Sequence, residues 1–120
     1  MRRFTFAELY EGATGEVILD AVVDAIRYGS MIHADDVARV LEVSPRELRG
    51  AFHLLTGMRL QDALTRWRWL QAREMILSSN YSLKEVAERC GWRSVRVMND
   101  VFCRYDTVSA VILMRRVRKH

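Results

Sequence analysis

The sequence predicts an all-α protein in which two helix-turn-helix subdomains are joined by a long linker helix, with about seven helices in total. Apolar residues recur with helical spacing along the chain, and a pattern of short helix, turn and capped helix occurs twice. Between the two copies, about twenty residues contain neither Gly nor Pro. The 120 residues are 50% hydrophobic and 28% charged, which is typical of a folded helical protein. We expect no second large domain in a chain of this length.

The first predicted helix runs from Glu16 to Tyr28 and is apolar over most of its circumference. Its polar residues fall on one narrow stripe, at Glu16, Asp20, Asp24 and Arg27. A helix with so wide an apolar face packs against the following helices or against a partner. Gly29 is placed to end this helix.

A first helix-turn-helix unit follows. Its first helix is expected to begin at Asp35 or Asp36 and to end at Leu41, and residues 42–43 form the turn. Ser44 is the residue type that caps a helix, so a second helix is expected to start directly after it.

The second helix of this unit has Pro45 at its first position, where the missing N–H costs nothing, and Glu47 is placed to complete a capping box with Ser44. Thr56-Gly57 marks its end. The helical period leaves four residues on the outward side: Arg46, Arg49, Gly50 and His53.

The long predicted helix runs from Leu60 to Ser79, and Asn80 marks its end. Ser82 then opens another capped helix, and residues 91–93 form a turn. Ser94 caps the helix that follows this turn. A second unit of the same kind as the first is therefore expected in this part of the chain.

The two units form an internal repeat. Asp36-Val37-Ala38 matches Glu85-Val86-Ala87 at an offset of 49, while Ser44, Leu48 and Phe52 match Ser94, Met98 and Phe102 at an offset of 50. The second turn is therefore one residue longer than the first. A single pattern of this kind is common in helical proteins, but two copies at this spacing are specific.

We expect three segments: residues 1–58 with the first unit, the linker helix 59–80, and residues 81–120 with the second unit. A helix of about twenty residues is roughly 30 Å long. Successive major grooves on one face of B-DNA lie ~34 Å apart. The linker is therefore the right size for one chain to reach two adjacent major grooves.

Charge is concentrated at the C-terminal end. Residues 81–120 carry nine basic and four acidic side chains, whereas residues 1–30 carry three basic and five acidic ones. A last helical stretch over 108–114 leads into the basic tail 115–120. A polyanionic partner such as DNA suits this distribution.

Several classes of protein are excluded by the sequence. No apolar run approaches the length of a membrane span, and no signal peptide is visible, so we expect a cytoplasmic protein. Cys90 and Cys103 are expected to be reduced thiols. No cofactor or metal site is expected, because the three His residues lie beside no Cys or carboxylate set with metal spacing. No phosphate loop or activated nucleophile is present, so an enzyme is not expected.

A set of short motifs occurs in a fixed order along about residues 16–116. The motifs are Asp36-Val37-Ala38, Ser44-Pro45-Arg46-Glu47-Leu48, Ala51-Phe52, Thr56-Gly57-Met58, Leu70-Gln71-Ala72-Arg73, Val86-Ala87-Glu88-Arg89-Cys90-Gly91-Trp92 and Phe102. In these residues the chain resembles the DNA-binding domain of the AraC/XylS family. The resemblance implies a bacterial transcription regulator, usually an activator, with seven helices and two recognition helices in adjacent major grooves. The chain is similar to the short members without a sensing domain.

By this resemblance, the base-reading positions are Arg46, Arg49, Gly50 and His53 in the first unit, and Val95, Arg96, Asn99, Asp100 and Cys103 in the second. Arg46, Arg49 and Arg96 have the planar fork that bonds guanine O6 and N7, and Asn99 can pair with adenine N6 and N7. Phosphate contacts are expected at Ser44 and Ser94, through the helix N-termini that they begin, and at Arg68, Arg93 and Arg104. For each single residue, a plain structural or solvated role remains the alternative.

Two departures from the family weaken the expected second surface. Asp100 carries a carboxylate that phosphates repel unless it accepts a bond from cytosine N4, and Val95 is an unusual choice beside it. Residues 107–110 read Thr-Val-Ser-Ala, where the family commonly has a Gly-x-Thr-Pro-like corner. The second unit is therefore expected to bind DNA more weakly than the first.

A second function from another class stays open. The same helical scaffold can serve as an adaptor or anti-activator that binds RNA polymerase or another regulator through the apolar face of the first helix. Between the two functions, the expected partners are double-stranded DNA and RNA polymerase. The expected oligomeric state is a monomer or weak homodimer.

Overall fold

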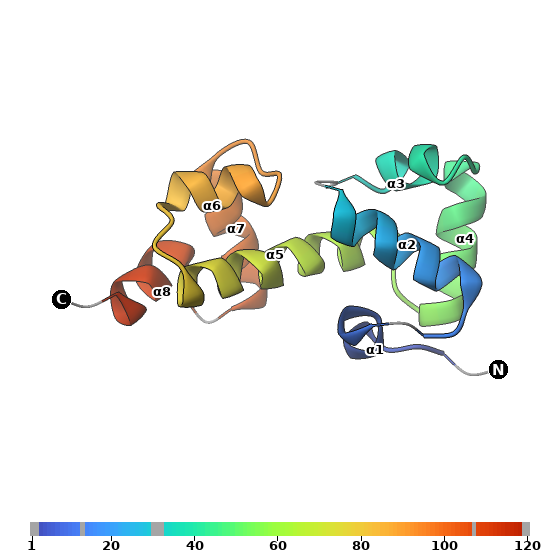
Figure 1. Ribbon diagram of the computed structural model, residues 1–120, viewed down its shortest axis with the longest axis horizontal. Helices are drawn as coiled ribbons and strands as arrows, with labels where there is room; N and C mark the ends of the chain where they lie inside the picture. The colour runs from blue at the N-terminus through green and yellow to red at the C-terminus, as the bar shows by residue number, and fades with distance from the viewer. Residues whose placement is uncertain (1–2, 13, 30–32, 107, 119–120) are drawn as a thin grey trace. The chain divides into compact units, whose positions relative to one another are not determined.

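The computed structural model describes residues 3–12, 14–29, 33–106 and 108–118, and in these ranges the chain forms eight α-helices and no strand (Figure 1). The helices are α1 (Phe6–Glu11), α2 (Val17–Tyr28), α3 (Ala34–Val40), α4 (Pro45–Thr56), α5 (Leu60–Ser78), α6 (Leu83–Arg89), α7 (Val95–Tyr105) and α8 (Ala110–Val117). The all-α prediction, with two helix-turn-helix subdomains and a long helix between them, is confirmed. No helix in the described ranges is both long and apolar enough to cross a membrane.

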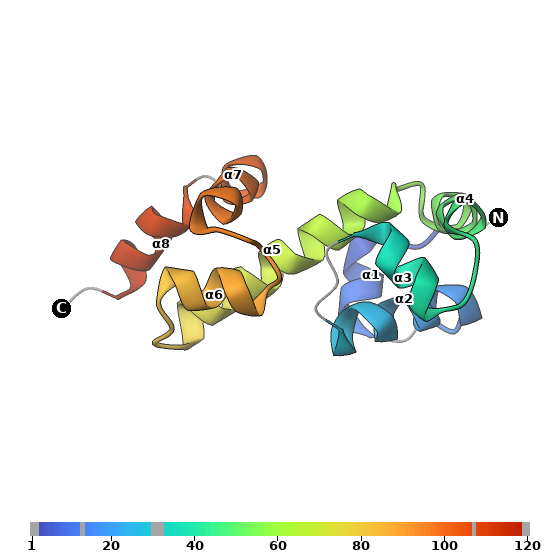
Figure 2. The same ribbon diagram turned by 90° about the horizontal axis from the view of Figure 1, so that it is seen from above.

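Two compact units make up the chain, Met1–Leu64 and Thr65–His120, and α5 begins in the first and continues through the second. In unit 1, α2 packs against both α3 and α4, as both views show (Figures 1 and 2). The wide apolar face of α2 is only partly used by this packing. Leu19 and Val22 are fully buried, whereas Val17 remains 80% exposed.

Helix α1 was not among the helices predicted from the sequence. Thr5 and Glu8 form a complete capping box, in which the Thr5 hydroxyl accepts from the Glu8 N–H and the Glu8 carboxylate accepts from the Thr5 N–H. Phe6 and Leu9 are buried. The signal was present in the sequence, because Thr followed three residues later by Glu is the mark of such a box.

The predicted start of α3 is wrong. His33, and not Asp35 or Asp36, occupies the N-cap position, and the His33 side chain makes no capping bond. The Ala34 N–H donates instead to the side-chain oxygen of Gln61, at 2.8 Å. The cap of α3 is therefore supplied by α5, 27 residues further along the chain, which a local sequence pattern does not reveal.

The turns of both helix-turn-helix units are closed by the same backbone hydrogen bonds. The Val43 N–H donates to the Ala38 carbonyl at 3.0 Å, and the Trp92 N–H donates to the Ala87 carbonyl at 2.9 Å. A hydrogen bond that joins the first and sixth residues of a helix end in this way is the Schellman motif. The motif requires a residue with left-handed backbone angles just after the helix. The internal repeat thus extends to the hydrogen bonds of the backbone. Arg93 is the extra residue of the second turn, inserted after the closure.

The left-handed position is filled differently in the two units. It is Gly91 in the second, with φ 86°, and Glu42 in the first, with φ 58°. A side chain in this region costs about 1 kcal/mol or more, because Cβ approaches the carbonyl oxygen. Glu42→Gly should therefore raise the free energy of unfolding by about 0.5–1 kcal/mol. This figure is smaller than the strain removed, because Gly also gives the unfolded chain more conformational entropy.

Urea unfolding measures this effect, and Gly91→Ala is the matched variant, which should destabilise by a similar amount. A lower urea midpoint for Glu42→Gly would show that the Glu42 side chain itself holds the turn.

Unit 2 has its own core, formed by the second half of α5 together with α6, α7 and α8. Met98 and Phe102 of α7 are fully buried in it, as is Cys90, and Trp92 is 7% exposed. Burial raises the pKa of the Cys90 thiol to about 11, against a smaller opposite effect of the Arg68 charge.

The other two tryptophans of the chain lie on α5. Trp67 is buried, and the ring of Trp69 packs in a tilted arrangement against the ring of Tyr105. The prediction that the tryptophans are packing residues is confirmed.

Candidate nucleic-acid interface

Helix α4 presents the four predicted residues on its outer side. Leu48 and Phe52 bury the opposite side in the core of unit 1. The helix begins with the Ser44 hydroxyl accepting from the Glu47 N–H, and it ends at Gly57, whose φ of 74° is left-handed. Among the contacts of the described residues, only this Ser44 half of the predicted capping box is formed. The outward residues Arg46, Arg49, Gly50 and His53 are all exposed.

Gly50 lies in the middle of this exposed face. A Cβ added there would meet no heavy atom within 4 Å, so packing within the chain does not require glycine at this position. Glycine inside a helix costs about 1 kcal/mol relative to Ala. What it provides is a flat surface between Arg46 and His53, where another molecule can come close to the helix backbone.

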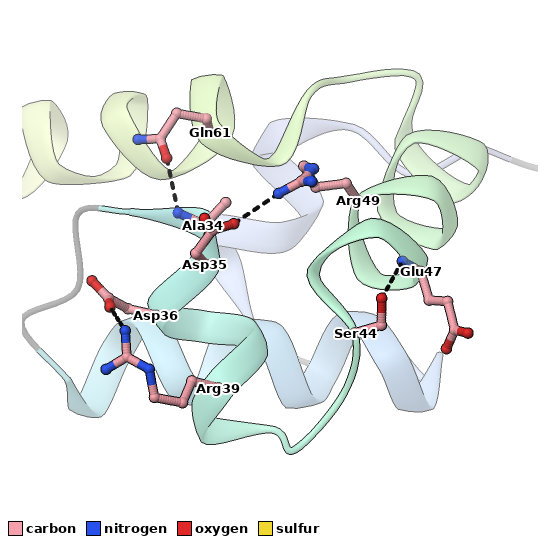
Figure 3. Close-up of polar contacts among 8 residues, drawn as sticks. All are labelled: Ala34, Asp35, Asp36, Arg39, Ser44, Glu47, Arg49 and Gln61. Carbon is pink, nitrogen blue, oxygen red and sulfur yellow. Dashed lines mark hydrogen bonds and ion pairs between the residues drawn. The ribbon is translucent and has the colours of Figure 1, made fainter.

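Arg49 is the member of this face that is tied to another helix. Its Nη1 atom lies 2.7 Å from Oδ1 of Asp35, in the first turn of α3 (Figure 3). A second ion pair on α3, between Arg39 and Asp36, stays within that helix and does not reach α4 (Figure 3). Of these two pairs, only the Asp35–Arg49 pair joins the two helices of the first unit.

Helix α7 is the equivalent helix of unit 2. The Ser94 hydroxyl accepts from the Val97 N–H at 3.2 Å, as the sequence predicted. Met98 and Phe102 are buried on one side, and Arg96, Asp100 and Cys103 are exposed on the other.

Two predicted base-reading residues of α7 are turned partly toward the protein. Val95 is half-buried and packs against the core of unit 2. Asn99 is also half-buried, and its side-chain oxygen accepts from the Ala110 N–H at 3.0 Å. Asn99 therefore caps α8, a structural role that the sequence analysis did not assign.

The corner before α8 is formed without the family's usual residues. Ser109 caps the helix by accepting from the Ile112 N–H, and Asn99 satisfies the N–H of Ala110. Helix α8 runs to Val117, three residues beyond the predicted end at position 114. Thr107 of the predicted corner and the last two residues of the basic tail lie outside the described residues.

Of the predicted phosphate contacts, Arg93 and Arg104 are exposed, and the Ser44 and Ser94 hydroxyls cap their helices. The prediction for Arg68 is wrong, because this side chain is buried, with only 3% of the residue exposed. Its Nη1 atom donates to the Gln71 side-chain oxygen at 2.7 Å, and burial lowers its pKa below the usual arginine value.

The sequence held a signal for this burial. Position 68 falls on a stripe of α5 with a spacing of four residues, whose other members are all buried: Leu60, Leu64, Ala72 and Ile76.

The profile of a helix-turn-helix domain, of the AraC type, matches residues 37–111, which is more than half of the chain. The chain belongs to the AraC-type helix-turn-helix family. It is accordingly a DNA-binding transcription regulator.

Solved structures of this type resemble the AraC-type chain over most of its length. The DNA-binding domain of AdpA, a global transcriptional factor solved in complex with a target DNA, is 28% identical, with a TM-score of 0.73 over 85% of this chain and 95% of its own. The C-terminal domain of AraT, a response regulator from Geobacillus stearothermophilus, is 25% identical, with a TM-score of 0.73 and coverage of 83% and 84%.

A DNA-binding transcriptional dual regulator from Escherichia coli K-12 shares the fold, with a TM-score of 0.74, 23% identity and coverage of 91% of this chain and 99% of its own. The comparison with curated proteins found no match.

The two outer faces of the AraC-type chain differ in charge at equivalent positions. An offset of 50 pairs Arg46 with Arg96, Arg49 with Asn99, Gly50 with Asp100 and His53 with Cys103. The α4 face thus has two arginines and no carboxylate at these four positions. The α7 face has one arginine and one carboxylate, which weakens its attraction for a polyanion.

Proposed function

We propose that this AraC-type regulator recognises a defined DNA sequence by inserting α4 and α7 into two adjacent major grooves of one duplex. The observation that carries the proposal is the outer face of α4. Two arginines, a histidine and a glycine are exposed together on one side of a helix whose opposite side buries Leu48 and Phe52 in a core. An α-helix with such a face fits the major groove of B-DNA.

Each residue receives a role from its chemistry. Arg46 and Arg49 would each donate two parallel bonds to guanine O6 and N7, and His53 would contact a neighbouring base edge. Gly50 would allow α4 to approach the duplex closely. On α7, Arg96 and Cys103 would face the bases, with Val95 and Asn99 contributing only from the edge of the surface.

Phosphates would be bound around these two helices. The first turn of α7 would bind phosphate oxygens through the backbone N–H groups that precede Val97, whose own N–H is bonded to Ser94. The first turn of α4 would contribute less, because Pro45 has no N–H and the Glu47 N–H is bonded to Ser44. Arg93 and Arg104 are exposed near the two ends of α7 and would add charge. Arg68 has no part in this interface because it is buried.

The length of α5 supports binding in two grooves. Its 19 residues correspond to about 28 Å of helix, close to the ~34 Å that separates successive major grooves on one face of B-DNA. We propose that one chain suffices for both contacts, that the protein acts in the bacterial cytoplasm as a monomer or weak homodimer, and that RNA polymerase is a further partner.

Selection of bound sequences from a pool of random duplexes tests this function. The expected result is a motif with two half-sites whose centres lie about one helical turn apart, 10–10.5 base pairs. Affinity for that motif should fall on the order of a thousandfold between 50 and 200 mM salt, as for about six phosphate contacts. Five base pairs inserted between the half-sites should abolish the tight binding. A pool without any enriched motif would contradict the proposal.

One observation favours a second function, in which the chain binds another protein as an adaptor. A cavity of about 330 Å³ opens between α2 and α4, and apolar residues line most of it. Val17, Ile18 and Leu48 are among these residues. A folded chain that enriches no DNA motif in the selection experiment would favour this function.

A further inference from the structure

We propose that Asp35 is a positioning residue for Arg49, holding its guanidinium so that it meets a guanine in one fixed orientation. The inference rests on the proposed function, because it concerns how α4 reads DNA. It assigns a role in base recognition to a residue of α3, which is not itself a recognition helix.

The geometry of the pair leaves Arg49 able to bind a base. A single bond joins Nη1 of Arg49 to Oδ1 of Asp35, at 2.7 Å (Figure 3). A guanidinium has five N–H donors in a rigid plane. Among the described residues, Asp35 is the one hydrogen-bond partner of this side chain. The Nε and Nη2 edge therefore stays available for two parallel bonds to guanine O6 and N7.

Asp35 is itself attached to a fixed part of unit 1. Its neighbour Ala34 is buried, and the Ala34 N–H donates to the side chain of Gln61 at 2.8 Å. Val37, half a turn further along α3, is fully buried. The first turn of α3 is thus anchored on two sides, so the carboxylate of Asp35 projects from a backbone that cannot easily shift.

The Asp35–Arg49 ion pair contributes little to the stability of the fold. The side chains of Arg49 and Asp35 are 51% and 69% exposed, and ion pairs with this exposure contribute little to stability. A carboxylate beside a DNA surface also repels phosphates and lowers affinity for every sequence. What the pair provides is an arginine whose flexible chain is already ordered before binding, which lowers the entropic cost of the base contact.

The test uses the full chain and compares Asp35→Asn with Asp36→Asn. Both substitutions remove one negative charge from the first turn of α3 and break one exposed ion pair, but only Asp35 reaches the recognition helix. For each variant, Kd is measured for the selected site and for a random duplex, and the melting temperature is recorded.

Asp35→Asn should lower the ratio of specific to non-specific affinity by about tenfold, through the loss of a well-oriented guanine contact. Its affinity for the random duplex should be unchanged or higher, because a negative charge has been removed. Asp36→Asn should leave the ratio within about twofold, since exposed pairs away from the base contact carry little energy. Asp35→Glu should restore part of the ratio. A purely structural role would lower the melting temperature without changing the ratio.

A double-mutant cycle then shows whether the effect passes through Arg49. In an Arg49→Ala background, Asp35→Asn should cause no further loss of specificity. A further loss there would overturn the inference, and so would an Asp35→Asn variant that binds the selected site more tightly, because Asp35 would then compete with DNA for Arg49. If Arg49→Ala alone leaves specificity unchanged, the assignment of Arg49 to the bases fails. If Arg49→Ala lowers specificity but Asp35→Asn does not, only the positioning role fails.

Discussion

Replacing Arg46 and Arg49 together by alanine should lower the affinity for the selected DNA site by about a hundredfold or more. A bidentate arginine–guanine pair is worth about 1–3 kcal/mol of discrimination, and each 1.4 kcal/mol is a factor of ten. Affinity for random duplexes should fall much less, because only two of many charges that attract phosphates are lost. Parallel titrations of the selected and random duplexes at fixed salt measure both effects.

The fold should survive this double substitution. Both side chains are exposed, and the described contact that is lost is the Arg49–Asp35 ion pair, worth about 0–1 kcal/mol. Arg39→Ala together with Arg116→Ala is the matched control, since it removes two exposed charges outside α4 and α7. If the control loses as much specificity as the Arg46 and Arg49 variant, α4 is not the surface that reads DNA.

Asp100→Asn should strengthen binding to both selected and random duplexes by about tenfold at low salt, because a carboxylate facing phosphates is repelled. Asp100 is exposed on α7 at the position where α4 has Gly50. Asn keeps the shape of the side chain and removes its charge. The gain should shrink as salt screens the repulsion, so titrations at 50 and 200 mM salt measure it.

Glu88→Gln serves as the control for this substitution, because it removes an exposed negative charge from α6 and not from the recognition helix. A different outcome would change the role of Asp100. If Asp100→Asn weakens binding to the selected site, and the loss depends on a cytosine at one position, then the carboxylate accepts a bond from cytosine N4 and reads that base.

Much of the fold follows from local patterns in the sequence. Ser44, Ser82 and Ser94 each begin a helix as predicted, because a cap bonds to a backbone N–H only three residues away. The outward set of α4 was also predictable, since the helical period alone determines which side Leu48 and Phe52 bury. The capping box of Thr5 and Glu8 belongs to the same class of signal, although α1 was not predicted.

The remaining features depend on contacts between distant parts of the chain. Gln61 caps α3 across 27 residues, and Asp35 meets Arg49 across 14. Asn99 was expected to face adenine and instead holds the start of α8, because the chain turns back on itself after α7. None of these partners has a fixed spacing in sequence, so only the folded chain brings them together. Arg68 differs, since the stripe of buried residues on α5 already indicated its position.

The two thiols differ in exposure, so a thiol reagent can label α7 selectively at Cys103. Cys103 is exposed on α7, on the same side of the helix as Arg96, while Cys90 is buried and its pKa is raised to about 11, so little of the Cys90 thiol ionises at neutral pH. A thiol-directed photo-crosslinker would consequently attach to the native sequence at a single position on this helix. Irradiation on a bound duplex would then mark the nucleotide lying next to that position, which orients the protein on its site without any engineered residue.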